Sequence, residues 1–179
     1  MGVYRIISVL VLGLCFAGPS FSDDKADPFD LSSISKKAEE LGVPTTSEVE
    51  EMEKRATELF NSKDCDAAIP ALDEYAKKSN WLANLVAAGL RPYYNASYDD
   101  RKDFPYRKVS PLTKYEDMAN EFKQKRNIAM VMLGECYAAI GDDKKAISYL
   151  RRALDLISLD NEEWWERARL GLYKIIKVG

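Results

Sequence analysis

The amino-acid sequence predicts an all-α protein built from antiparallel helix pairs. From residue 46 onward, apolar residues recur at the three- and four-residue spacing of an α-helix. Serine, aspartate or asparagine stands where helices would begin, and glycine or proline where several would end. No segment supports a strand comparably well. A chain of 179 residues is long enough for one core, so we expect a single helical domain over 46–179.

The first 22 residues read as a secretory signal peptide. Arg5 supplies a positive start, and the apolar run that follows over 6–17 is too short to span a bilayer. Small serines close the segment and predict cleavage after Ser22. We therefore expect a periplasmic or secreted protein.

A lipid-anchored form is the alternative, with Cys15 as the acylated residue. The preceding residues resemble a bacterial lipoprotein box, although Leu14 stands where that motif has a small residue. Only this form would associate with a membrane.

The mature chain would keep Cys65 and Cys136. Two thiols in an oxidising compartment can form a disulfide. The favoured reading is the other one, in which both are small buried residues of helices. Neither spacing nor neighbours indicate a metal site.

Residues 23–45 are polar and aperiodic at first, which is typical of a flexible leader. Within this leader, Ser32–Leu41 could form a short helix that Gly42 and Pro44 would end.

Three helices are expected before the next irregular segment. Ser47 and Glu50 have the spacing of a capping box, which opens the first of them. Asp64 or Asp66 caps the second, which the polar stretch 77–80 closes. The expected helices span about 48–61, 64–80 and 81–90.

Residues 91–109 lose helical periodicity and predict a long aromatic loop. Tyrosines beside charged groups can stack on sugars or other flat ligands, so a small-ligand or glycan-binding site is an alternative function. The other reading is that the aromatic rings only fasten the loop to the helices. The candidate ligand residues are Tyr93, Tyr94, Tyr98, Asp99, Arg101, Phe104 and Tyr106.

Three further helices follow the loop. Ser110 is expected to cap the first, with Pro111 in its first turn, and no breaker appears before Gly141. Asp142 or Asp143 then caps a second helix, and a third begins after Asp160 or Asn161. The last helix carries one apolar stripe, which consists of Trp164, Trp165, Ala168, Leu172, Ile175 and Ile176.

The sequence also contains an internal repeat. Ala56 stands twelve residues before Ala68, and Gly134 stands twelve before Ala146. The second copy resembles the tetratricopeptide repeat (TPR), in which small residues let paired helices approach closely. The residues that carry this resemblance are Leu133, Gly134, Tyr137, Ala146, Leu150 and Ala153.

The repeat departs from the TPR pattern in three places. Met130 replaces the usual tryptophan, Ser158 replaces the usual proline, and the copies lie 78 residues apart. The expected architecture is therefore a short, irregular TPR-like solenoid, and the alternative is a generic antiparallel helical bundle.

The TPR resemblance implies a concave groove that binds a protein or peptide partner. Its mostly apolar character would suit an amphipathic helix or a hydrophobic peptide. The favoured reading of the Trp164 stripe is core, and if left uncovered it would bind a partner or a second copy. The implied groove residues are Ile128, Val131, Glu135, Ala138, Trp165, Ala168, Leu172 and Ile175.

Composition argues against catalysis and nucleic-acid binding. The chain has no histidine, which removes the commonest general base and metal ligand. Its formal net charge of -3 provides no basic field for nucleic acid. We expect no catalytic residue, cofactor or metal. The sequence thus predicts an exported TPR-like adaptor.

Overall fold

The computed structural model describes residue 42 and residues 44–177. The interpretations made for residues 1–22 and 23–41, including the short helix at Ser32–Leu41, lie outside this part. All regular structure in the described part is helical, as the sequence predicts, and none of it is strand. The elements are α2 (Thr46–Asn61), α3 (Cys65–Gly89), the 3-10 turn η1 (Tyr93–Asn95), α4 (Tyr98–Arg101), α5 (Tyr106–Ala139), α6 (Asp143–Leu156) and α7 (Glu162–Ile176).

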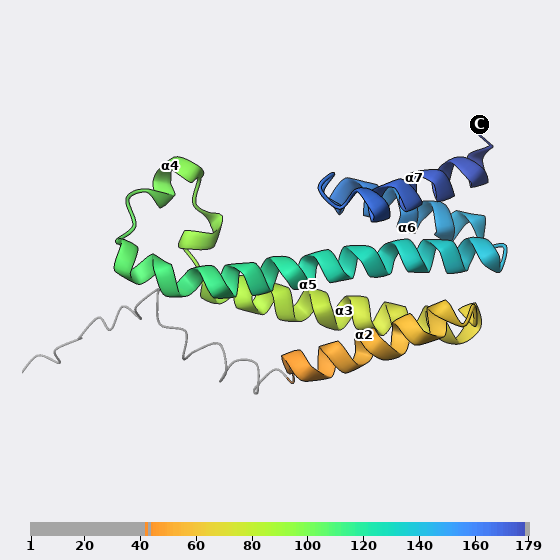
Figure 1. Cartoon of the computed structure of the whole chain (residues 1–179), viewed down its shortest axis with the longest axis horizontal. Coiled ribbons are helices and arrows are strands. Elements are labelled where there is room, and N and C mark those ends of the chain that lie inside the picture. The colour runs from red at the N-terminus through yellow and green to blue at the C-terminus, as the bar shows by residue number, and fades with distance from the viewer. Residues whose placement is uncertain (1–41, 43, 178–179) are drawn as a thin grey trace, which may run out of the picture.

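The long helices stack in chain order (Figure 1). α2 packs against α3, α3 against α5, α5 against α6, and α6 against α7, which also touches α5. The segment that carries η1 and α4 projects from one end of the α3 and α5 pair. Both faces of α5 are therefore covered along part of its length.

The hairpins α2–α3 and α5–α6 are closed by the same type of turn. Lys63 and Gly141 both have positive φ, at 63° and 82°. The next residue in each turn, Asp64 or Asp142, caps the following helix by accepting a backbone N–H. The repeated positions Ala56, Ala68, Gly134 and Ala146 are all buried. The 78-residue repeat is thus also a repeat of local structure.

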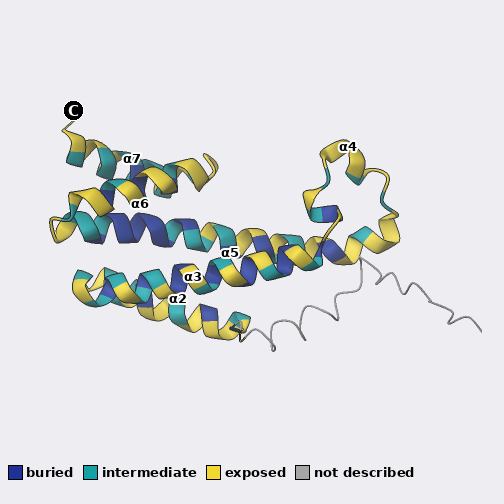
Figure 2. Ribbon diagram, turned by 180° about the vertical axis from the view of Figure 1, so that it is seen from behind, coloured by how far each residue is buried: buried dark blue, intermediate teal, exposed yellow. Residues whose placement is uncertain are grey.

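Two clusters of buried side chains hold the stack together. One joins α2, α3 and α5, and the other joins α5, α6 and α7. Figure 2 shows buried residues concentrated where α3 faces α5, with exposed residues on α4 and the outer helices. The largest fully buried side chains include Leu72, Leu90, Leu112, Leu133 and Leu150.

The helix break expected at 77–80 is wrong, because α3 runs unbroken from Cys65 to Gly89. Ser79 is fully buried, and its hydroxyl donates to the Phe122 carbonyl oxygen at 2.8 Å. A polar residue that predicts a helix end is tolerated here because its hydrogen bond crosses to α5. The residues of 81–90 extend α3 and form no third helix, and Trp81 on this segment is 49% exposed.

Two predicted helix starts are also wrong. The capping box of α2 joins Thr45 and Glu48 instead of Ser47 and Glu50. The two pairs have the same spacing, and the earlier start puts Val49 in the core. α5 likewise begins at Tyr106, so the loop predicted for 91–109 is shorter and contains two short helical turns.

Pro111 lies inside α5, in its second turn. Its missing N–H costs that turn a hydrogen bond. Leu112 beside it is 1% exposed, and Val109 packs on the same core cluster. Burial of these apolar side chains therefore stabilises the first turns of α5, which the local sequence signals place outside the helix.

Cys65 and Cys136 form a disulfide, so the expectation of two separate buried thiols is wrong. Cys65 begins α3, and Cys136 lies in the last turn of α5. Because the two helices pack antiparallel, these ends meet, and the two Cα atoms lie 5.1 Å apart.

Candidate functional site

The predicted groove residues separate into three groups in the structure. Val131 and Ala168 are fully buried and belong to the cluster that joins α5, α6 and α7. They hold the helices together and line no open surface. Ile128, Trp165 and Leu172 are half-buried against the core clusters. Their buried faces make the apolar stripe of α7 largely a packing surface.

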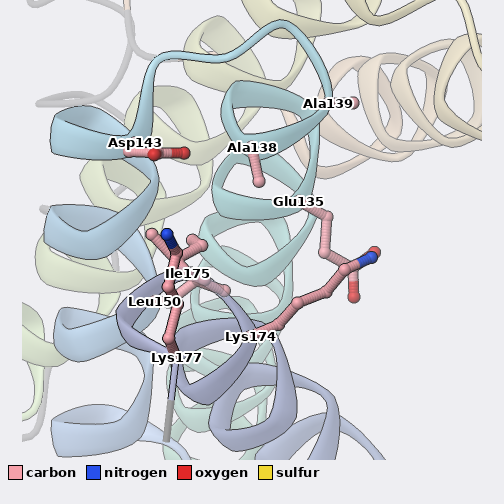
Figure 3. A pocket seen from close by; sticks show the side chains of 9 residues that line it. Glu135, Ala138, Ala139, Asp143, Leu150, Lys174, Ile175 and Lys177 are labelled. Atoms are coloured by element: carbon pink, nitrogen blue, oxygen red, sulfur yellow. The ribbon is translucent and has the colours of Figure 1, made fainter.

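The third group is Glu135, Ala138 and Ile175, which line one pocket of about 490 Å³. This pocket, called the α5–α7 pocket below, lies between the end of α5, the start of α6 and the end of α7 (Figure 3). Its complete lining is Glu135, Ala138, Ala139, Asp143, Leu150, Gly171, Lys174, Ile175 and Lys177.

The α5–α7 pocket combines an apolar interior with charges of both signs. Ala138 and Ile175 supply apolar surface, and Glu135, Asp143 and Lys174 supply charges. Figure 3 shows Lys174 and Glu135 pointing toward one another on one side, with Asp143 on the other. Such a lining can contact an apolar side chain and hydrogen-bond the polar atoms beside it.

Small residues let Leu150 pack closely between α5 and α7 beside this pocket. Leu150 lies between Gly134 of α5 and Gly171 of α7. A Cβ on Gly134 would lie 2.6 Å from Leu150 Cγ, and a Cβ on Gly171 would lie 3.2 Å from Leu150 Cδ1. The repeat pattern predicts close packing at Gly134 but says nothing of the lysines that follow Gly171.

Arg167 ties three helices together beside the pocket. Its guanidinium donates two hydrogen bonds to the Glu135 carboxylate, with N–O distances of 3.0 and 2.6 Å. It also lies over the Trp164 ring at 4.2 Å and over the Phe60 ring of α2 at 5.7 Å. Glu135, predicted as a groove residue, is therefore oriented by α7.

Most of the predicted loop residues fasten the loop. Arg101 donates to the Tyr94 and Ala96 carbonyl oxygens and pairs with Glu116 of α5 at 2.8 Å. Arg101 also covers the Tyr93 ring, which is buried and meets Phe104 edge to face. These contacts fit the reading in which aromatic rings attach the loop to the helices.

Tyr94 is fastened in the same way. Its hydroxyl donates to Asn120 Oδ1 and accepts from Lys123, both at 2.8 Å. The outward-facing members of the predicted set are Tyr98 and Tyr106, at 79% and 81% exposed, and Asp99, which pairs with Lys102. Lys102 also lies over the Tyr98 ring, 4.6 Å from its centroid.

Residues 44–177 bring together no group of three or more potential metal-binding side chains. Over the same residues, no helix has the length and apolar character needed to cross a bilayer.

The fold and pocket define an all-α protein of stacked helix pairs with a small, open pocket at one end. Comparison of the chain with protein-family models, with curated proteins and with solved structures found no match.

Proposed function

We propose that this chain is an exported TPR-like adaptor that binds a protein or peptide partner. The observation that carries the proposal is the α5–α7 pocket, with its apolar interior and its rim of two carboxylates and two lysines. An extended or helical segment with one apolar anchor and flanking charges would match this lining.

The relationship to TPR proteins is supported by the shared turn of the two hairpins. The helix pairs stack in chain order, and small buried residues recur twelve positions apart in both. Such stacks present the first helix of each pair along one face. On this face Arg167 of α7 contacts Glu135 of α5 and Phe60 of α2.

Export is supported by the disulfide between Cys65 and Cys136. Such bonds persist in oxidising compartments and are rare in reducing ones. N-terminal sequencing of the protein from its host tests this, and we expect it to start at Asp23. Labelling of Cys15 with a fatty-acid analogue would favour the lipid-anchored alternative, and an intact Met1 in a cytosolic fraction would contradict export.

The binding proposal is tested by capture from envelope extract with residues 23–179 carrying an N-terminal tag. The test variants are Lys174→Glu, which reverses a rim charge, and Ala138→Phe, which fills the pocket. Lys54→Glu is the matched control, because Lys54 is also exposed but lies on α2. Circular dichroism checks that each variant keeps its helices.

The proposal expects a defined set of proteins that the wild type and Lys54→Glu capture and both pocket variants lose. Equal capture by all four proteins would contradict this use of the pocket. The small-ligand alternative would then be tested at Tyr98 and Tyr106, whose rings face solvent.

A further inference from the structure

A second pocket lies on a different face of α5, between α3, α5 and α6. It has a volume of about 280 Å³, smaller than the α5–α7 pocket. The side chains of Arg126 and Arg152 both line it. Its other lining residues are Asp73, Ala76, Lys77, Asn80, Met130, Leu133 and Tyr149.

Within residues 44–177, Arg126 is held here without a carboxylate partner. Its guanidinium donates to Asn80 Oδ1 and, through Nε and Nη2, to Asn127 Oδ1 at 3.0 and 2.8 Å. These three bonds use three of the five N–H donors of an arginine, which leaves two. The group is only partly exposed. A half-buried cation with spare donors favours an anion beside it.

Arg152 adds a second positive charge to the same pocket. It is exposed on α6, and among the described residues it has no hydrogen-bond or ion-pair partner. Burial, and secondly the charge of Arg152, lower the pKa of Arg126. The two arginines thus lie close enough to repel each other, and an anion between them would relieve that repulsion.

The nearby carboxylate does not neutralise this pair. Asp73 forms an ion pair with Lys77 on its own helix, with an N–O distance of 2.5 Å. The positive charge of the pocket therefore remains available to a ligand.

We infer that this pocket binds a small organic anion through a carboxylate or phosphate group held between Arg126 and Arg152. Arginine forks match both oxyanions, which accept parallel hydrogen bonds. The pocket exceeds the size of the charged group alone, and the half-buried ring of Tyr149, with Met130 beneath the arginines, lines the rest of it. The site is independent of the α5–α7 pocket.

The inference is tested by calorimetric titration of the full chain with phenyl phosphate, with benzoate, and with neutral benzyl alcohol. The test variant is Arg152→Gln, which removes an exposed charge that makes no hydrogen bond or ion pair among the described residues. Arg151→Gln is the matched control, because Arg151 is the neighbouring arginine on α6 but lies outside the pocket and pairs with Asp155.

We expect saturable binding of at least one of the two anions, which weakens as sodium chloride is added. Arg152→Gln should weaken that binding about tenfold, whereas Arg151→Gln should change it less than about twofold. Whichever anion binds more tightly identifies the oxyanion class. Absence of binding by both anions, equal binding of benzyl alcohol, or unchanged affinity in Arg152→Gln would each overturn the inference.

Discussion

At Gly134 the absence of a side chain lets α5 and α6 approach closely. A Cβ there would lie 2.6 and 2.7 Å from two carbons of Leu150 and 3.3 Å from its backbone nitrogen. Distances this short cannot be relieved by the Leu150 side chain alone. The α5–α6 hairpin can therefore pack this closely only with glycine at position 134.

Gly134→Ala should lower the free energy of unfolding by roughly 1–3 kcal/mol, because overpacking outweighs the gain in helix propensity of about 1 kcal/mol. Gly171→Ala is the matched change, since its Cβ would meet only the flexible end of Leu150, at 3.2 Å. Urea denaturation should rank Gly134→Ala as clearly less stable. If Gly171→Ala were the less stable variant, α5 and α6 would be packed more loosely at Gly134 than the structure shows.

Two capping carboxylates make stability depend on pH at the residue scale. The Thr45 backbone N–H donates to Glu48 at 2.6 Å and is the main reason that the Glu48 pKa is lowered. The Lys145 backbone N–H does the same for the pKa of Asp142. Both carboxylates therefore stay ionised in the folded protein at a pH where the same carboxylates are protonated in the unfolded chain.

These caps therefore raise the free energy of unfolding at a pH above the pKa values of the unfolded chain, which are about 4. The stabilisation is lost as the pH falls through the lower pKa values of the folded protein. Glu48→Ala/Asp142→Ala should be less stable than the wild type at pH 5–7, and the difference should shrink toward pH 3. Urea midpoints across this range measure it. Glu51→Ala, exposed on the same helix as Glu48, is the control, and a difference that grows in acid would contradict the assignment.

At the scale of elements, α7 depends on a few contacts because it packs against α6 and, less extensively, α5. Arg167 reaches Glu135 on α5 and stacks on Trp164. Lysine keeps the charge but has neither the planar fork nor the stacking surface.

Arg167→Lys should loosen α7 by about 1 kcal/mol, so that its amides exchange with solvent about fivefold faster. Hydrogen-exchange mass spectrometry should find the change in 162–176, with α3 unaffected. Arg151→Lys, which alters an exposed pair with Asp155, is the control. Uniform loosening of every helix would indicate a global effect instead.

At the scale of the whole molecule, the disulfide closes a loop between residues 71 positions apart. The loop contains all of α3, the projecting α4 segment and most of α5. Closing a loop of that length lowers the entropy of the unfolded chain, and the chain-entropy estimate of the effect is about 4 kcal/mol.

Cys65→Ser/Cys136→Ser should therefore lower the free energy of unfolding by roughly 2–4 kcal/mol, and a reducing agent should destabilise the wild type but not the variant. Thermal denaturation with and without reductant measures both effects. Intact mass spectrometry of alkylated protein counts the free thiols. Two alkylated cysteines at these positions in protein taken from its host would contradict the bond.

Local signals in the sequence determined the helical class, the turn at Gly141, a cap at Asp142 or Asp143 and the repeated small residues from Ala56 to Ala146. Each depends on residues within a few positions of one another. A helix face, a positive φ or a cap leaves its mark in such a short window. The structure confirms these features.

Contacts between distant residues decided the rest. Ser79 continues a helix because it donates to Phe122, 43 positions away, and Cys65 meets Cys136 because α3 and α5 are antiparallel. The α5–α7 pocket shares only three residues with the implied groove, since packing buried Val131 and Ala168. Arg126 and Arg152 likewise line one pocket only because of the way α6 packs on α5. One sequence pattern fits several such arrangements, and only the packing of complete helices selects among them.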